Sequence, residues 1–321
     1  MPIQVVVARD YEQMSELGAK FVRADIRKRL HEKPEYLLGL ATGNSPVGLY
    51  KNLAASANRG DFDPHRIRSF NLDEYVGLPG ENAQLRTVHP ASYCYFMVTE
   101  FFALLQHKFV ETNVPFANLI DQAELIANLN KYPRDWRETG GDSGRAITIK
   151  AKAESPYLAW VKNEILDAYA KKIARYGGID LQIIGVGGRG HVAFHEAGIP
   201  FRSGAVLLVK LDENTVINAV ADGHFDSIDS VPRFAVTMGA ELVYRARTVL
   251  LLASGERKQE PVARSLIEDP STAIPISYGQ KYAQDGGELI YIIDEVAGKL
   301  LLKSRAKLKA KGVKIVDRRR A

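Results

Sequence analysis

The chain alternates short apolar runs with helical patterns, and this alternation restricts its fold more than any other feature. Apolar runs typical of buried strands occupy residues 3–7, 36–41, 67–72, 181–186, 206–209, 249–253 and 289–293. Apolar residues at helical spacing occupy residues 10–24, 47–55, 157–176 and 257–267. Strands separated by helices predict an α/β fold of the Rossmann-like kind, with a doubly wound, mostly parallel sheet and helices on both faces. In such folds ligands bind at the carboxyl ends of the strands.

One segment does not follow this alternation. Residues from about 124 to 155 are polar and rich in Gly, Asp and Arg, and they are too many for an ordinary connection. We interpret them as an insertion, either a lid or an oligomer contact. Because no Pro/Gly/Ser linker divides the rest, residues 1–298 are expected to form a single domain.

The basic residues are concentrated at the C-terminus. The 321 residues carry a formal charge of +5, and ten Lys and Arg against one Asp fall within residues 299–321. Residues 1–298 are therefore net acidic, and bulk charge does not indicate a nucleic-acid partner. We interpret residues 299–321 as a solvated, frayed C-terminal tail in preference to an anion-binding arm.

Cysteine content and hydropathy narrow the class of protein further. Cys94 is the only cysteine, which excludes an internal disulfide framework and a multi-cysteine metal site. No run approaches the roughly 18 apolar residues of a membrane-spanning helix, and the N-terminus lacks the pattern of a signal peptide. We expect a cytoplasmic protein without a membrane partner.

The first segment with chemical potential is the junction between strand 36–41 and helix 47–55. Thr42 and Ser45 offer hydroxyl groups, and Gly43 lets a ligand approach the backbone. With Asn44 they form a loop whose N–H groups would suit a phosphate at a helix N-terminus. A tight turn with no ligand is the alternative, because the Gly-Lys-Ser/Thr element of a P-loop is absent.

Two further segments place acid and base groups after strands. Asp73 and Glu74 directly follow the strand at 67–72, where one could serve as a base or cap the next loop. In the glycine-rich segment 185–198, His191 and Glu196 could form an imidazole oriented by a carboxylate, while His195 competes with His191.

The fourth segment is residues 250–258, again an apolar strand, a glycine and a helix start. Lys258 stands one turn into that helix, where its side chain could fold back toward a phosphate. A solvated lysine on the helix surface is the alternative reading.

Taken in order, these segments resemble those of the glucosamine-6-phosphate deaminase/isomerase family, whose fold is shared by 6-phosphogluconolactonases. Its most specific match is Asn-Leu-Asp-Glu-Tyr-Val-Gly-Leu-Pro, residues 71–79, which favours the deaminase branch. Supporting matches are residues 42–46, 89–93, 190–196, 231–239 and 255–258.

The resemblance implies an aldose-ketose isomerase/deaminase that acts on a hexosamine 6-phosphate or a related sugar phosphate. Asp73 would be the base that moves a proton between C2 and C1, and His191, positioned by Glu196, would assist ring opening. The 42–45 loop and Lys258 would hold the 6-phosphate. The resemblance implies no metal or redox cofactor, and we also expect a homo-oligomer.

The chain departs from the family pattern at three positions. Arg189 stands where the family has Asp, so it would perturb His191 or pair with Glu196. The arginine that the family uses to bind the phosphate aligns near Val220, where this chain has no arginine. Asn44 stands where the family has the second glycine of the phosphate loop. These departures leave two alternatives open: a related reaction, such as lactone hydrolysis, in which Arg189 binds a substrate anion, and a non-catalytic sugar-phosphate sensor.

Overall fold

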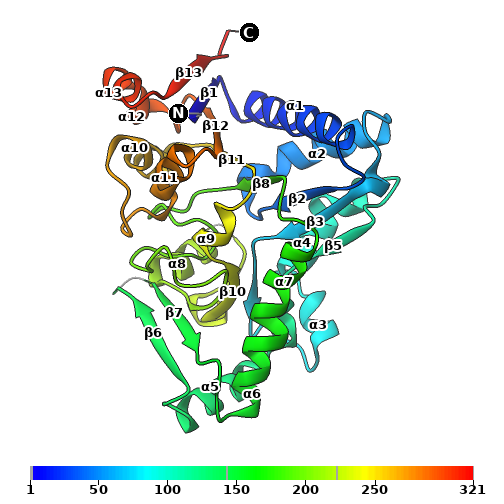
Figure 1. The fold of residues 1–321 in the computed structure, drawn as a ribbon, viewed down its shortest axis with the longest axis vertical. Helices are drawn as coiled ribbons and strands as arrows, with labels where there is room; N and C mark the ends of the chain where they lie inside the picture. Colours follow the sequence, from blue (N-terminus) through cyan, green and yellow to red (C-terminus); the bar gives the residue numbers. More distant parts are fainter. Residues whose placement is uncertain (1–2, 142–143, 222, 321) are drawn as a thin grey trace.

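Two β-sheets with flanking helices make up the described residues, 3–141, 144–221 and 223–320, of a computed structural model (Figure 1). The larger sheet has eight strands there, and every adjacent pair is parallel. In spatial order its strands are β13 (Lys314–Asp317), β1 (Ile3–Ala8), β12 (Glu288–Asp294), β11 (Thr248–Ala253), β8 (Leu181–Ile184), β2 (Tyr36–Leu40), β3 (Ile67–Asn71) and β5 (Glu111–Asn113). The predicted doubly wound parallel fold is confirmed.

The order of the strands reverses near the middle of the parallel sheet. From β2 the chain proceeds through β3 to β5 in one direction, whereas from β8 it proceeds through β11 to β12 in the other. The point of reversal lies between β2 and β8, which pair at Leu38 and Leu181. An open α/β sheet forms its ligand crevice at such a point, beyond the carboxyl ends of the strands.

Helices cover the parallel sheet on both faces (Figure 1). One face carries α1 and α2, which also pack against each other, and the other carries α7, α10 and α11. Strands β2, β8 and β11 are buried at every position, as expected when both faces are covered. The helices are α1 (Tyr11–Leu30), α2 (Asn44–Asn58), α3 (Ala83–Thr87), α4 (Tyr93–Glu100), α5 (Gln122–Lys131), α6 (Pro156–Trp160), α7 (Ala168–Arg175), α8 (Glu213–Ala221), α9 (Ala240–Val243), α10 (Gln259–Ile267), α11 (Gly279–Gln284), α12 (Lys299–Leu302) and α13 (Arg305–Ala310). In the described part of the chain, no helix combines the length and the apolar character needed to cross a membrane.

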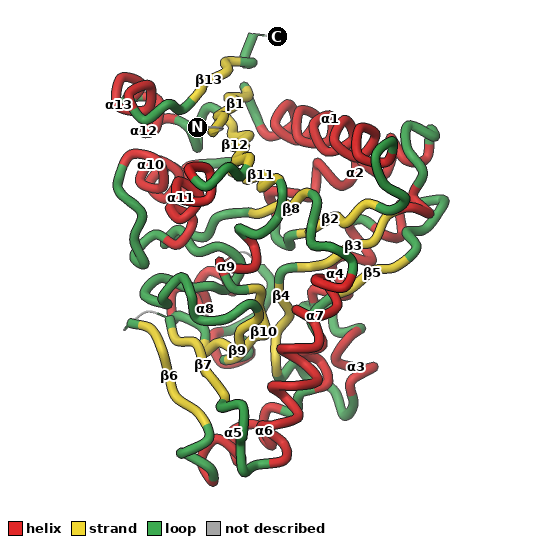
Figure 2. The backbone as a smooth tube through the Cα atoms, viewed as in Figure 1, coloured by secondary structure: helices red, strands yellow, loops and turns green. Residues whose placement is uncertain are grey.

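The smaller sheet is antiparallel and differs from expectation (Figure 2). Its strands, in spatial order, are β4 (Asp73–Val76), β10 (Phe234–Met238), β9 (Val206–Lys210), β7 (Arg145–Ile149) and β6 (Trp136–Gly140). The sequence pattern assigned the run at 206–209 to the parallel sheet, and this was wrong. No helix intervenes between β8 and β9, and without a crossover helix the returning strand pairs in antiparallel fashion elsewhere.

The predicted insertion at 124–155 forms part of this second sheet. It contains most of α5 and the strands β6 and β7, which pair antiparallel from Trp136 with Ile149 to Gly140 with Arg145. Strand β7 also pairs with β9, so the segment extends the sheet at its edge. Residues 142–143 lie outside the described residues. A role as a lid or as an oligomer contact stays a prediction.

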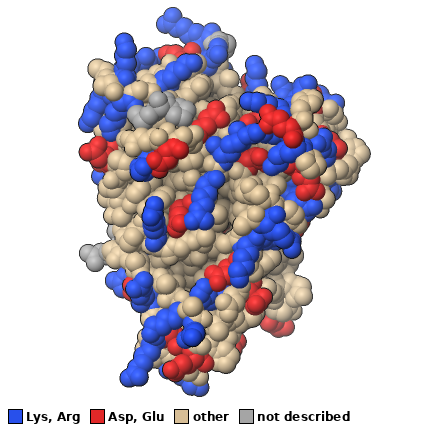
Figure 3. All heavy atoms as spheres, viewed as in Figure 1, with Lys and Arg blue, Asp and Glu red and all other residues tan. Residues whose placement is uncertain are grey.

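The expectation that residues 299–321 form a frayed tail is wrong. Residues 299–310 hold α12 and α13, and β13 pairs in parallel with β1, from Gln4 with Lys314 to Val7 with Asp317 (Figure 2). The basic side chains gather at this end of the molecule, over α12, α13 and β13 (Figure 3). Counting charges missed the apolar residues between them, because Leu301 and Leu308 are fully buried.

Candidate active site

A cavity of about 470 Å³ lies where the strand order reverses. We call it the switch-point cavity. It is lined by the segments that follow four parallel strands, namely Ala41–Ser45 after β2, Leu72 and Asp73 after β3, Gly185–Gly188 after β8 and Ser254–Lys258 after β11. One wall comes from α8 and the loop beyond it. The four segments that sequence reasoning selected separately therefore line one cavity.

Asp73 is the buried carboxylate of this cavity. It begins β4, is 6% exposed and lines the cavity wall. Burial, and then the negative charges of Glu74 and Glu196, raise the pKa of Asp73 well above its usual value. A carboxylate with a raised pKa is a stronger base once ionised, so this environment suits a group that takes up a proton and returns it.

Glu74 has a different task from its neighbour. It is fully buried, and its Oε2 accepts hydrogen bonds from Ser92 Oγ at 2.7 Å and from the backbone N–H of Cys94 at 3.0 Å. Its Oε1 accepts from the backbone N–H groups of Tyr75 and Tyr93. The carboxylate thus caps the first turn of α4 and ties it to β4. Burial raises the pKa of Glu74, and these hydrogen bonds oppose that effect.

His191 and Glu196 form the predicted couple. The Nδ1 atom of His191 lies 2.9 Å from Glu196 Oε2, and Thr215 Oγ1 donates a hydrogen bond of 2.6 Å to Glu196 Oε1. Glu196 is completely buried, whereas the His191 side chain is 21% exposed and lines the cavity. The imidazole lies against Gly187, where an added Cβ would come within 2.1 Å of Nε2. Only glycine leaves room for the ring there.

His195, the competing histidine, has a structural role. It is completely buried, its Nδ1 accepts a hydrogen bond from the N–H of Ala240, and its Nε2 lies 3.1 Å from the carbonyl oxygen of Ile199. These partners fix one neutral tautomer. Burial lowers the pKa of His195 to about 4, so it is uncharged at neutral pH. Sequence could not rank the two histidines because exposure to the cavity distinguishes them.

The loop at 42–45 enters α2 in a form suited to an anion. Gly43 precedes the helix with a φ of 94°, a conformation that favours glycine, and among the described residues no side chain caps the first helical N–H groups. Tyr11 holds this turn: its hydroxyl donates to the carbonyl oxygen of Asn44 and accepts from the N–H of Gly48. These N–H groups lie beside the cavity, so the loop is better suited to binding a phosphate than to acting as a tight turn without a ligand.

Lys258 extends from the segment after β11 into the same cavity. Its Nζ donates a hydrogen bond of 2.6 Å to the carbonyl oxygen of Val186, across from its own strand. Asp294, at the end of β12, holds the segment by accepting from Ser254 Oγ at 2.6 Å and from the N–H of Gly255. The ammonium group is therefore fixed over the cavity instead of being solvated on a helix surface.

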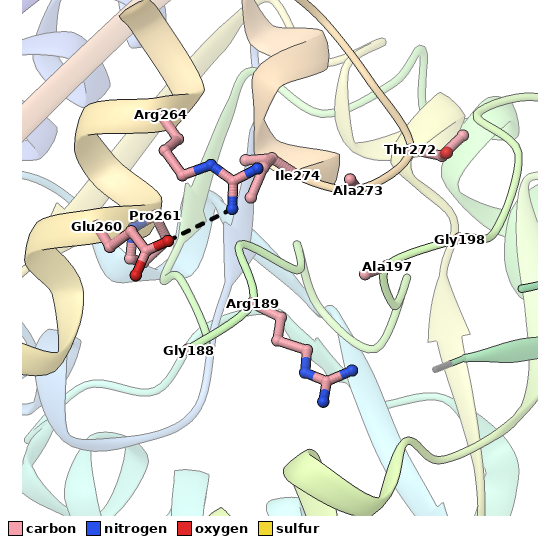
Figure 4. A pocket seen from close by; sticks show the side chains of 10 residues that line it. All are labelled: Gly188, Arg189, Ala197, Gly198, Glu260, Pro261, Arg264, Thr272, Ala273 and Ile274. Atoms are coloured by element: carbon pink, nitrogen blue, oxygen red, sulfur yellow. Dashed lines mark hydrogen bonds and ion pairs between the residues drawn. The ribbon is translucent and has the colours of Figure 1, made fainter. Parts of the chain in front are cut away.

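Arg189, which was expected to perturb His191 or to pair with Glu196, lines a different cavity. It lines a neighbouring cavity with Glu260 and Arg264, and its side chain extends away from that pair (Figure 4). Its guanidinium forms an ion pair with Asp212, at 3.3 Å, while Glu196 interacts with His191 and Thr215. The expected pairing of Arg189 with Glu196 is therefore wrong, because the loop directs the guanidinium toward the start of α8.

Several lining residues were not found by sequence reasoning. They are Tyr11, Tyr75, Tyr93, Ala193, Phe194, Thr215, Asn218, His224 and Arg257. Ala193 has a φ of 53°, a left-handed conformation that costs a non-glycine residue about 1–3 kcal/mol. Tyr75, Tyr93, Ala193, Phe194 and Arg257 lie within the matched segments but were given no role there. No pattern marks Thr215, Asn218 or His224, because tertiary folding alone brings α8 and the loop beyond it over the cavity. Within the described residues, no group of three or more His, Cys, Asp or Glu side chains is arranged to hold a metal ion.

The fold and the cavity define an α/β protein with acid, base and anion-binding groups at its switch point. No family model matches the chain. Glucosamine-6-phosphate deaminase of Clostridium perfringens (strain SM101 / Type A) is 35% identical over 300 residues, which cover 93% of this chain and 100% of that protein. That of Halothermothrix orenii is 31% identical over 299 residues, with the same coverage.

A solved structure of a monomeric glucosamine-6-phosphate deaminase has a TM-score of 0.69 and 27% identity to this chain, and it covers 93% of this chain and 100% of its own. A 6-phosphogluconolactonase from Trypanosoma cruzi has a TM-score of 0.60 at 18% identity, with 93% and 97% coverage, and shares the fold. The chain belongs to the glucosamine-6-phosphate deaminase family, which is a family of enzymes.

Proposed function

We propose that the protein deaminates and isomerises glucosamine 6-phosphate or a closely related amino-sugar phosphate, releasing ammonia and a ketose phosphate. The observation that carries this proposal is the meeting of Asp73, His191 and the anion-binding groups in one cavity. The deaminases to which the chain is similar support this substrate class.

The phosphate of the substrate binds at one end of the cavity. The N–H groups at the start of α2, with Thr42, Asn44 and Ser45 beside them, surround its oxygens, and the Lys258 ammonium offsets its charge. This anchoring places the reacting carbons at Asp73 without a further loss of rotational freedom during the reaction. Residues 1–298, which form the cavity, are net acidic, so anion binding depends on these local groups.

Ring opening is the first chemical step. His191 takes the proton of the hydroxyl group on C1 and delivers a proton to the ring oxygen, which breaks the C1–O bond of the ring and leaves an open-chain aldehyde. Glu196 orients the imidazole through Nδ1 and stabilises its protonated form. Thr215 holds Glu196 in place from the opposite side.

Proton transfer between carbons follows. Asp73 removes the proton from C2, the electrons form a C1–C2 double bond, and the aldehyde oxygen becomes a hydroxyl group by taking up the proton that the protonated amino group on C2 releases. Asp73 then returns the C2 proton to C1, which leaves a protonated imine at C2. Water adds to this imine, the C–N bond breaks, and ammonia and the ketose phosphate are the products. Asp73 thereby ends in its starting state.

A substrate panel tests the proposal. We expect ammonia from glucosamine 6-phosphate, at least 100-fold lower kcat/KM for glucosamine because the phosphate anchor is absent, and no acceleration of 6-phosphogluconolactone hydrolysis. Hydrolysis of the lactone without ammonia release would replace the proposed reaction with the lactonase alternative. Binding of sugar phosphates with turnover of none would favour the sensor.

A further inference from the structure

The ion pair between Arg189 and Asp212 lies next to the proposed catalytic histidine and takes no part in the proposed proton transfers. Arg189 stands two residues before His191, and its guanidinium lies 3.3 Å from Asp212 Oδ2. The Asp212 side chain is 5% exposed and the Arg189 side chain is 49% exposed. Asp212 directly precedes α8, and its Oδ1 accepts a hydrogen bond from the N–H of Asn214. The pair therefore joins the loop that carries His191 to the first turn of α8.

Asp212 also acts electrostatically on the catalytic couple. The pKa of Asp212 is raised by burial, lowered by the Asn214 hydrogen bond and raised by Glu196; Arg189 and His191 lower it. Two buried carboxylates, Glu196 and Asp212, thus act on one imidazole. Of these two carboxylates, Glu196 is the one that is hydrogen-bonded to the His191 ring. Oδ2 of Asp212 accepts no hydrogen bond from the described residues, and the guanidinium of Arg189 faces it as an ion-pair partner.

The position of Arg189 argues against direct contact with substrate in the switch-point cavity. It lines the neighbouring cavity of about 490 Å³, where Arg264 pairs with Glu260 (Figure 4). The residues of α8 beyond Asp212, in contrast, do line the switch-point cavity, among them Thr215 and Asn218. A contact that fixes the start of α8 therefore also fixes one wall of the site.

We propose that Arg189 and Asp212 are a positioning pair that fastens the His191 loop to α8 and neutralises Asp212, so that Glu196 is the carboxylate whose charge acts on His191. This inference rests on the proposed function, since it assigns His191 a proton-transfer role. It explains how a cation is accommodated two residues from His191: its charge is balanced by an acid from another element. Arg189 is then a positioning residue and does not touch the substrate.

Replacing each partner by a neutral residue should shift the pH midpoint of the His191 ring in opposite directions. In Arg189→Met the unneutralised Asp212 carboxylate favours the protonated imidazole, so the pH midpoint of the His191 ring should rise by about 0.5 unit or more. In Asp212→Asn the remaining positive charge of Arg189 disfavours the protonated imidazole, so the pH midpoint of the His191 ring should fall. In the double variant both charges are gone, and the midpoint should return to within about 0.2 unit of the native value.

Other charged groups around the imidazole are the same in all variants. They are Asp73 on β4, Glu196 on the same loop, His224 beyond α8, and Glu256, Arg257 and Lys258 after β11. The matched control is Arg264→Met, which removes the other arginine of the Arg189 cavity and should leave the midpoint unchanged. NMR titration of the His191 ring is the readout, and the pH profile of kcat/KM is recorded beside it.

The outcomes separate the two proposals. Opposite shifts that cancel in the double variant support the positioning pair, even if the protein releases no ammonia, in which case only the proposed function fails. Shifts in the same direction, or no shift in either single variant, overturn the pair. If a single variant does not fold, the double variant still decides, because a midpoint displaced by more than 0.5 unit contradicts the proposed charge balance.

Discussion

At the scale of single residues, adjacent side chains in this site have separate tasks. Asp73 and Glu74 follow each other on β4, and successive side chains of a strand point to opposite sides. Asp73 therefore lines the cavity, while Glu74 caps α4. The sequence allowed a base and a cap as alternative readings of this pair, and the structure contains one group in each position. What the sequence lacked was the direction of each side chain.

Asp73→Asn should stabilise the protein while removing the proposed base. The folded pKa of Asp73 is raised, so its contribution to stability is present below its unfolded pKa and is lost as the pH rises through the folded value. Asparagine is not ionised, so the variant should exceed the native free energy of unfolding by about 1–2 kcal/mol at high pH. Near pH 4 the difference should vanish.

Urea unfolding at several pH values measures this difference. The matched control is Asp269→Asn, at a fully exposed carboxylate, which should change the free energy of unfolding by less than about 0.5 kcal/mol at every pH. A variant of Asp73 that is less stable than the native protein at high pH would show that the ionised carboxylate is well solvated in the cavity.

His195 should make the fold sensitive to acid. Its folded pKa of about 4 lies below the ordinary value of 6.5, so its contribution to stability is present above pH 6.5 and is lost as the pH falls through 4. The loss amounts to about 3 kcal/mol. The variant His195→Gln can still donate a hydrogen bond to Ile199 and should lose this part of the pH dependence. Equal acid sensitivity of both proteins, in urea unfolding at pH 4 and pH 7.5, would contradict the assignment.

At the scale of elements, the site is assembled from turns at the ends of parallel strands. Local patterns predicted these turns well, because a short apolar run followed by glycine and a helix start is a local signal. The antiparallel sheet was not predicted. Strand β4 is separated from β3 by Leu72 alone, and pairing with β10, about 160 residues later, is a long-range choice that no local pattern specifies.

Lys258→Ala should weaken phosphate binding more than turnover. The ammonium group is fixed over the cavity by Val186, and its loss removes one charged contact, worth about 1.5–3 kcal/mol. We expect KM for glucosamine 6-phosphate to rise about 10- to 100-fold with a smaller change in kcat. The control Lys281→Ala, at an exposed lysine on α11, should leave both constants unchanged. A fall in kcat at constant KM would remove Lys258 from the phosphate site.

At the scale of the whole molecule, the C-terminal segment is part of the fold. We propose that residues 299–320 and the rest of the chain unfold together, because β13 pairs with β1 and Leu308 is fully buried. The charge count predicted a tail because it averaged over lysines that lie on the surface and ignored the leucines beneath them. Burial is a property of the tertiary structure, and the apolar residues here are too few to form a strong pattern.

Leu308→Ala tests this integration. The substitution leaves a cavity under α13 and should lower the free energy of unfolding by about 2–5 kcal/mol. Lys307→Ala, at the exposed neighbouring position, should change it by less than about 0.5 kcal/mol. If both substitutions were neutral in urea unfolding, the C-terminal segment would be frayed in solution.

In the proposed deamination of an amino sugar, one cavity unites a base, a ring-opening histidine and a phosphate anchor. Simultaneous assay of ammonia and ketose phosphate, released from glucosamine 6-phosphate by the native protein and by Asp73→Asn, tests this assignment. We predict equal amounts of the two products from the native protein, and a rate about 100- to 10,000-fold lower from the variant, although the variant is folded. No ammonia from the native protein, or an undiminished rate from the variant, would contradict the assignment of Asp73 as the base of this reaction.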